Sequence, residues 1–150
     1  MPTFLSSSAM ETSRWAEKIF KRTIKVFKKK SRHGLVIALK GDLGAGKTTF
    51  VKSFLKSAGI KKQITSPTFL IFRPYSFNRK KHNFIYHVDA YRLKSVKEAA
   101  PLGLREIINN PKNIVLIEWA EKIKKLLPKD TVWLEFKHGN KENERLIKFK

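Results

Sequence analysis

A glycine-rich segment at residues 41–49 has the residue types and spacing most directly suited to chemistry. Its order is Gly41-Asp42-Leu43-Gly44-Ala45-Gly46-Lys47-Thr48-Thr49. Glycines reach positive φ and let backbone N–H groups approach an anion, and a helix that begins at such a loop adds its positive dipole end. Lys47 supplies a charge for the β- and γ-phosphates, and the Thr48 hydroxyl can bind Mg²⁺. The spacing is that of a Walker A motif, or P-loop, and predicts that all nine residues border a nucleotide's phosphates.

Two carboxylates end apolar runs further along the chain. Glu118 follows Ile-Val-Leu-Ile, and Asp89 follows Ile-Tyr-His-Val. Mg²⁺ beside a γ-phosphate needs oxygen ligands or ligand-bound waters, and ligands of open α/β sheets lie at the carboxyl ends of the strands. Both acids are therefore predicted to face the nucleotide. In the alternative interpretations, Glu118 caps a helix that begins near Trp119, and Asp89 pairs with Arg92.

Three further positions have weaker predicted roles. Ser66-Pro67-Thr68 stands between the predicted loop helix and the next strand, where nucleotide switches place a hydroxyl group that senses the γ-phosphate. Taken alone, the segment reads as an ordinary proline turn. Trp119 could pack in the core or lie near the nucleotide or a partner. His87 is interpreted as a strand or supporting residue rather than a base.

The hydrophobic pattern predicts the elements that must position these residues. Helices are expected at residues 12–30, 47–57, 104–108 and 120–127, and strands at residues 35–39, 69–77, 84–88, 113–117, 132–136 and 146–149. Residues 35–39 form a continuous apolar run, which is typical of a strand buried on both faces of a parallel sheet. The order of elements predicts an α/β fold with a P-loop NTPase-like sheet, mostly parallel with antiparallel strands and flanked by helices. At 150 residues, we expect residues 1–150 to form a single domain.

Composition limits the setting in which the protein works. The chain has no cysteine, which excludes disulfides and thiolate chemistry, and it has no apolar run long enough to span a membrane. We expect a cytoplasmic protein with no membrane contact. Its formal charge of +21 would attract nucleic acid, so direct tRNA contact is possible. In the alternative interpretation, the charge reflects a lysine-rich composition, and the lysines form a solvated surface without a binding role.

Four motifs in the same order resemble the bacterial tRNA threonylcarbamoyladenosine biosynthesis ATPase family, TsaE. Besides residues 41–49, they are Ser66-Pro67-Thr68-Phe69, His87-Val88-Asp89-Ala90-Tyr91-Arg92-Leu93 and Ile117-Glu118-Trp119-Ala120-Glu121. Residues 8–18 also resemble the family's N-terminal helix. Val88 and Ala90 replace bulkier residues that the family often has, and Ala16 replaces a frequent glycine. None of these departures removes a reacting group.

The resemblance implies an ATPase that uses ATP and Mg²⁺ and whose activity depends on partner proteins. The implied partners are a threonylcarbamoyl-transferase subunit and its inactive paralogue, and the product is N6-threonylcarbamoyladenosine beside the tRNA anticodon. On this resemblance, Thr48 and Glu118 hold Mg²⁺, Lys47 binds phosphates, Asp89 assists hydrolysis, and Thr68 belongs to the switch loop. Thr12 and Arg145 are expected to border the nucleotide. Contact with tRNA is expected through the partners.

Other functional classes remain open from the residues alone. A small-molecule P-loop kinase would need an acceptor pocket and usually an arginine-bearing lid, and no insertion between Asp89 and Glu118 clearly provides such a lid. A nucleotide-regulated RNA-binding module could use exposed aromatic residues to stack bases, the candidates being Phe69, Phe72, Tyr75 and Phe77. These aromatics are also typical of sheet packing. A GTPase is disfavoured because the guanine-reading Asn-Lys-x-Asp motif is absent.

Overall fold

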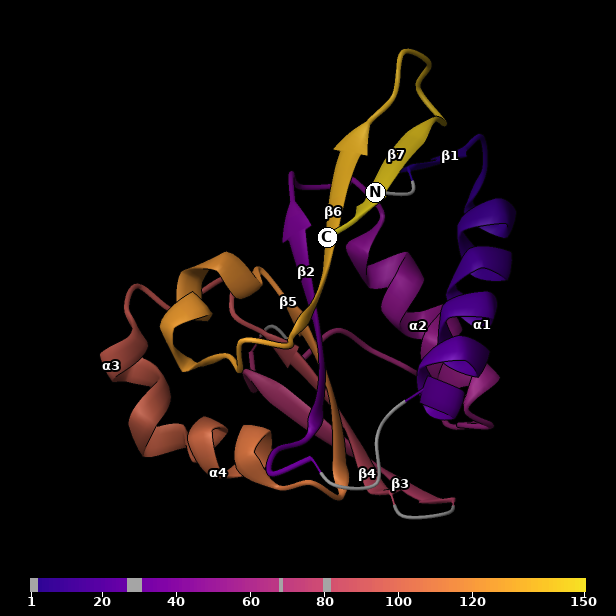
Figure 1. The fold of residues 1–150 in the computed structure, drawn as a ribbon. Coiled ribbons are helices and arrows are strands. Elements are labelled where there is room, and N and C mark those ends of the chain that lie inside the picture. Colours follow the sequence, from indigo (N-terminus) through magenta and orange to yellow (C-terminus); the bar gives the residue numbers. More distant parts are fainter. Residues whose placement is uncertain (1–2, 27–30, 68, 80–81) are drawn as a thin grey trace.

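The computed structural model describes residues 3–26, 31–67, 69–79 and 82–150, which form one seven-stranded sheet with helices on both faces (Figure 1). The strand order is β1-β7-β6-β2-β5-β4-β3. The strands are β1 (Thr3–Ser6), β2 (Leu35–Gly41), β3 (Phe72–Arg79), β4 (His82–Asp89), β5 (Asn113–Glu118), β6 (Val132–His138) and β7 (Arg145–Phe149). The predicted α/β sheet flanked by helices is therefore confirmed.

The centre of the sheet is parallel and its edges are antiparallel. β2 pairs in parallel with β5 and β6, and β4 pairs in parallel with β5. β3 runs antiparallel to β4, while β7 runs antiparallel to both β6 and β1. In this register Leu39 stands opposite Glu118, and Glu118 opposite Asp89. Both predicted site carboxylates thus lie at the carboxyl end of the parallel strands, on neighbouring strands.

Alternate residues of the central strands pack against two different helical layers. Leu35, Ile37 and Leu39 of β2 join a core with one layer, while Val36 and Ala38 join a core with the other. The first layer contains α1 (Ala9–Val26) and α2 (Lys47–Ser57), and the second contains α3 (Val96–Ala99), η1 (Ala100–Leu102), α4 (Leu104–Asn109) and η2 (Ala120–Leu126). Burial on both faces explains why the β2 sequence is apolar without alternation.

Aromatic rings join α1 and α2 to each other and to the sheet. Phe20 meets Phe54 edge to face with ring centroids 5.1 Å apart, and Phe50 meets Phe136 of β6 at 5.8 Å. Trp15 packs against Phe50 at 5.8 Å. Since full burial of a phenylalanine contributes about 1.5–3 kcal/mol, these contacts fix the position of α2, which begins at the glycine-rich loop.

Three predicted elements differ from the structure in ways that have a physical cause. The strand expected from Phe69 begins at Phe72, because Leu70 N–H donates to the Pro67 carbonyl in a turn (2.8 Å) that leaves Phe69 83% exposed. The helix expected at residues 120–127 is a 3₁₀ segment interrupted at Ile123, whose φ is −119°. The first helix begins at Ala9 rather than at residue 12, because the Ser8 hydroxyl accepts a hydrogen bond from Glu11 N–H (3.2 Å).

Other features of the chain had no clear sequence signal. β1, α3 and η1 were not predicted, and each is no longer than four residues. The end of the first predicted helix, at residues 27–30, lies outside the described residues. Among the helices that the structure describes, none is long and apolar enough to cross a membrane.

One ion-pair cluster ties β6 to its neighbours and predicts a pH effect. Lys150 and Lys40 lie 2.8 Å and 3.2 Å from the Glu135 carboxylate, and together they lower the pKa of Glu135 from 4.5 to about 2. Stability from this cluster is present above the unfolded pKa and is lost as the pH falls from about 4.5 toward about 2. In urea unfolding at a series of pH values, the excess stability of wild type over Glu135→Gln should shrink across this window. Glu142→Gln, in the exposed β6–β7 turn, is the matched control. A difference that does not change with pH would contradict this assignment.

Candidate functional site

The glycine-rich loop leaves β2 at a point where the chain has no room for a side chain. A Cβ at Gly41, whose φ is 135°, would lie 2.0 Å from the Phe136 carbonyl oxygen of β6. Gly46 precedes α2 with a φ of 99°, and Gly44 also has positive φ, at 72°. The positive φ predicted for the glycines is thus found at all three positions, and the loop turns directly into the first turn of α2.

Lys47 lies folded back into this loop. Its ammonium group donates to the carbonyl oxygens of Gly41 and Asp42, both at 2.6 Å, and lies 4.0 Å from the centre of the Trp119 indole. The residue is only 4% exposed. Burial lowers the pKa of Lys47, and the nearby carboxylates, Glu118 first among them, oppose that shift. The indole therefore lies beside the lysine, and it also packs against the core that contains Ala120 and Ile123.

A line of three polar side chains crosses from α2 to the sheet. The Thr48 hydroxyl donates to Glu118 Oε2 at 2.7 Å, and His87 Nε2 lies 2.8 Å from Glu118 Oε1. Thr48 is in the first turn of α2, and Glu118 ends β5, 70 residues away. The Glu118 carboxylate is buried, and its contacts are with Thr48 and His87. These contacts differ from those of the helix cap that the alternative interpretation proposed.

Asp89 lies next to Glu118 across the β4–β5 register. Its carboxylate accepts from Tyr91 N–H at 3.0 Å and from the Ser66 hydroxyl at 3.3 Å. Arg92, the alternative partner from the sequence, lies over the Phe69 ring at 4.3 Å. Ser66 thus brings the predicted switch segment to Asp89, whereas Thr68 lies outside the described residues.

Two cavities border the loop, and both are lined by Gly44, Gly46 and Thr49. The first, here called the carboxylate cavity, brings together most of the predicted site residues. Its other lining residues are Leu43, Lys47, Thr48, Ser66, Asp89, Tyr91, Glu118 and Trp119. The glycine-rich loop, the β4 end and the β5 end, which are far apart in sequence, therefore share one cavity.

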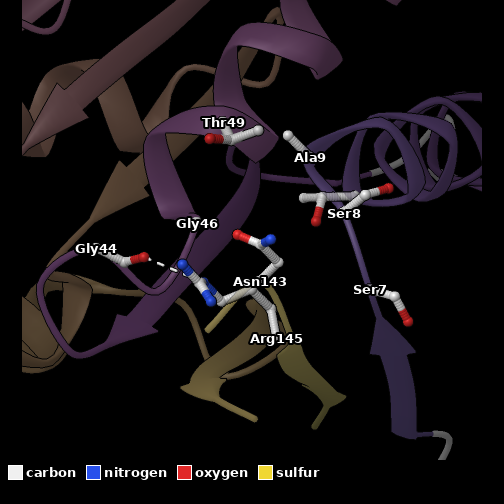
Figure 2. A pocket seen from close by; sticks show the side chains of 9 residues that line it. Ser7, Ser8, Ala9, Gly44, Gly46, Thr49, Asn143 and Arg145 are labelled. Atoms are coloured by element: carbon white, nitrogen blue, oxygen red, sulfur yellow. Dashed lines mark hydrogen bonds between the residues drawn. The ribbon is translucent and has the colours of Figure 1, made fainter. Parts of the chain in front are cut away.

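The second cavity, here called the N-terminal cavity, lies between the loop, the start of α1 and the β6–β7 hairpin (Figure 2). Thr12 and Arg145, which the family resemblance placed near the nucleotide, both line it. Thr12 is buried and shares a hydrogen bond with the Ser6 hydroxyl at 2.8 Å. Arg145 Nε donates to the Gly44 carbonyl at 3.2 Å, the dashed line in Figure 2.

The hairpin holds the loop at two successive carbonyl groups. His138 and Arg145 are register partners on β6 and β7. His138 Nε2 is 3.0 Å from the Leu43 carbonyl oxygen, next to the Gly44 carbonyl that Arg145 binds. The sequence analysis missed His138, as well as Tyr91 and Asn143 as cavity residues. A contact across 95 residues has no local sequence pattern that could reveal it.

The contacts of Thr48 and Glu118 suit a hard cation. The Thr48 hydroxyl donates its hydrogen to Glu118, which leaves its oxygen lone pairs available for a metal ion. Hydroxyl and carboxylate oxygens are the ligand types that Mg²⁺ prefers, and both line the carboxylate cavity beside the loop. The residues present therefore fit Mg²⁺, with Thr48 and Glu118 as the side chains that would hold it.

The fold and the site together define a class of α/β protein. Its central parallel strand leads through a glycine-rich loop into a helix, and two carboxylates at the ends of neighbouring strands lie beside that loop. The family model described as "Threonylcarbamoyl adenosine biosynthesis protein TsaE" matches residues 6–147. The chain belongs to the TsaE family.

Individual relatives and a solved structure agree with this assignment. The chain is 39% identical to the tRNA threonylcarbamoyladenosine biosynthesis protein TsaE of Rickettsia typhi over 137 residues, 90% of each chain. It is 34% identical to the protein of the same name from Treponema pallidum over 141 residues, 92% of this chain and 95% of that one. The crystal structure of Bacillus subtilis YdiB matches with a TM-score of 0.73 and 30% identity, covering 99% of this chain and 83% of that one.

The close approach at Gly41 predicts an unequal effect of two glycine substitutions. Gly41→Ala adds a Cβ that overlaps the Phe136 carbonyl, whereas Gly59→Ala, also at positive φ, has no atom within 4 Å of its new Cβ. Gly59→Ala should lower the free energy of unfolding by about 1–2 kcal/mol, and Gly41→Ala by more than about 3 kcal/mol. Chemical denaturation of both variants measures the difference. Equal losses would show that the β6 contact does not explain the glycine at position 41.

Proposed function

We propose that this protein is a cytoplasmic P-loop ATPase that binds and hydrolyses Mg-ATP in support of the complex that makes N6-threonylcarbamoyladenosine in tRNA. The observation that carries the proposal is the 2.7 Å hydrogen bond from Thr48 to Glu118. It joins the last part of the glycine-rich motif to the carboxylate at the end of the neighbouring strand. A phosphate grip and a cation ligand thus lie together, as phosphoryl transfer requires.

The residues of the two cavities bind different parts of the nucleotide. The loop amides and Lys47 bind the phosphates, with the Lys47 ammonium exchanging its carbonyl partners for phosphate oxygens. Thr48 and Glu118 would hold Mg²⁺, which would supply positive charge beside the phosphates. Thr12 and Arg145, in the N-terminal cavity, border the nucleoside end.

Asp89 is the residue that we assign to the attacking water. It stands beside Glu118 in the carboxylate cavity, and the Tyr91 amide and the Ser66 hydroxyl orient its carboxylate. A carboxylate fixed in this way can accept a hydrogen bond from water and point its oxygen at a bound γ-phosphate. Thr68, two residues after Ser66 in the sequence, is proposed as the switch residue.

The packing of the chain gives less support to the two alternative functions. The segment between Asp89 and Glu118 does not form a free lid, because Leu93, Leu104 and Ile108 pack in the core. Tyr75 and Phe77, two of the candidate base-stacking residues, are 5% and 4% exposed and also belong to the core. Among the four candidate RNA-binding aromatics, Phe69 is the exposed one, at 83%.

The family supplies the biological setting of the proposal. The relatives carry names that refer to tRNA threonylcarbamoyladenosine biosynthesis. We assign to this chain the same two partners that the sequence resemblance implies, a threonylcarbamoyl-transferase subunit and its inactive paralogue. The partners carry out the transfer and hold most of the tRNA contacts, and the +21 charge of this chain is available for direct contact.

Two substitutions test the ATPase assignment. Lys47→Ala should weaken ATP binding by more than about a hundredfold, because it removes a buried cation that binds phosphate oxygens. Glu118→Ala should lower Mg-ATP hydrolysis about a hundredfold or more while it weakens binding by less than about tenfold. Calorimetric binding and phosphate release, measured for the protein alone and with both partners, separate the two effects.

Lys52→Ala is the matched control, because Lys52 is an exposed lysine of the same helix. It should leave both ATP binding and hydrolysis unchanged. Equal ATP affinity of wild type and Lys47→Ala would refute the phosphate site. Full partner-stimulated hydrolysis by Glu118→Ala would refute the metal assignment.

Arg145→Ala tests the N-terminal cavity separately. The change removes the donor to Gly44 and a cation from the cavity wall, so ATP affinity should fall about tenfold. Lys148→Ala removes the same charge from the same strand without altering a cavity-lining residue. If both variants lose equal affinity, the effect comes from overall charge, and the cavity has no specific role.

A further inference from the structure

His87 is the buried titratable residue to which the proposed function gives no task. It lies on β4, two residues before Asp89, and its register partner on β5 is Leu116, two residues before Glu118. Side chains two apart on a strand share a face of the sheet, so His87 and Glu118 both point to the α2 side. The imidazole is fully buried. This position places Nε2 of its ring within hydrogen-bond distance of the Glu118 carboxylate.

We propose that His87 is a positioning residue for the metal-binding carboxylate of Glu118, an inference that rests on the proposed function. The two oxygens of Glu118 have separate partners, since Oε1 meets His87 Nε2 at 2.8 Å and Oε2 meets the Thr48 hydroxyl at 2.7 Å. Rotation about the last side-chain torsion of a glutamate is otherwise broad. The imidazole therefore fixes which oxygen faces Thr48 and the cavity.

The direction of the hydrogen bond follows from the other ring nitrogen. His87 Nδ1 is buried and has no hydrogen-bond partner among the described residues. A ring hydrogen on Nδ1 would remain unsatisfied, whereas on Nε2 it is donated to a carboxylate oxygen that can only accept. His87 thus holds its hydrogen on Nε2 and donates it to Glu118 Oε1, so it fixes the orientation of the carboxylate that a cation needs.

A purely structural role for His87 predicts a different result. If the imidazole served only to fill space between β4 and α2, replacing it would weaken nucleotide binding equally with and without Mg²⁺. A positioning role acts through Glu118, so its loss should reduce specifically the gain in affinity that Mg²⁺ gives. The ratio of the two affinities separates these roles.

The test measures ADP affinity of the full chain by calorimetry, with Mg²⁺ and with EDTA, for wild type, His87→Gln, His87→Asn and His87→Leu. Glutamine carries an N–H at about the reach of Nε2, asparagine is one methylene shorter, and leucine has no donor. The Mg²⁺ gain should fall about tenfold or more in the leucine and asparagine variants. It should be largely retained in the glutamine variant, with the EDTA affinities similar throughout.

Thermal unfolding without nucleotide shows which variants are folded, and the glutamine–asparagine pair decides the question if the leucine variant is not. Either of two results overturns the assignment of His87 alone. In the first, the Mg²⁺ gain of the leucine and asparagine variants equals that of wild type. In the second, the Mg²⁺ gain falls by the same factor in the glutamine and asparagine variants. An equal loss of affinity in Mg²⁺ and EDTA overturns it as well. Wild-type protein that binds ADP with no Mg²⁺ gain overturns the metal assignment of Glu118 and the role of His87 with it.

Discussion

The site depends on the parallel register between β2 and β5, which places Leu39 opposite Glu118. Because the glycine-rich loop follows β2 and α2 follows the loop, this register determines which β5 side chain meets the first turn of α2. A shift by one residue would turn the carboxylate to the other face of the sheet. The hydrogen bond from Thr48 to Glu118 depends on the observed pairing, and the position of Asp89 beside Glu118 follows from the adjacent β4–β5 register.

The loop itself is held from two sides by residues remote in sequence. Behind it, the Phe136 carbonyl lies so close to Gly41 that a side chain at this position would overlap it. At its outer end, His138 and Arg145, opposite each other on the β6–β7 hairpin, contact the carbonyls of Leu43 and Gly44. The hairpin thus fixes two successive carbonyl groups of the loop. A loop organised before an anion binds loses less conformational entropy on binding than a mobile one.

Local sequence patterns predicted the parts of the molecule that follow local rules. The β2 and β5 runs, the start of α2 and the three positive-φ glycines were all recognisable, because burial on both faces and glycine spacing leave a mark within a few residues. The contact of His138 with Leu43 joins residues that are 95 apart in the sequence, and no local pattern predicts it. The turn at Phe69 was read as strand because its residues are apolar, yet the hydrogen bond to Pro67 determines the backbone there.

Two non-glycine residues with positive φ border the carboxylates, and their positions connect strain with the site. Ile71, at φ 66°, precedes β3 and accepts a hydrogen bond from Asp89 N–H at 2.8 Å, while Trp119, at φ 58°, directly follows Glu118. Each left-handed residue costs about 1–2 kcal/mol, and a β-branched side chain makes the conformation rarer still. The surrounding packing offsets this cost. In return, the Ile71 carbonyl holds the Asp89 backbone, and the turn at Trp119 places the indole beside Lys47 rather than along the axis of β5. The two strained backbone positions thus lie where the two carboxylates and the lysine are held together. Backbone strain of this kind clusters at functional sites, where it positions side chains at a cost in stability.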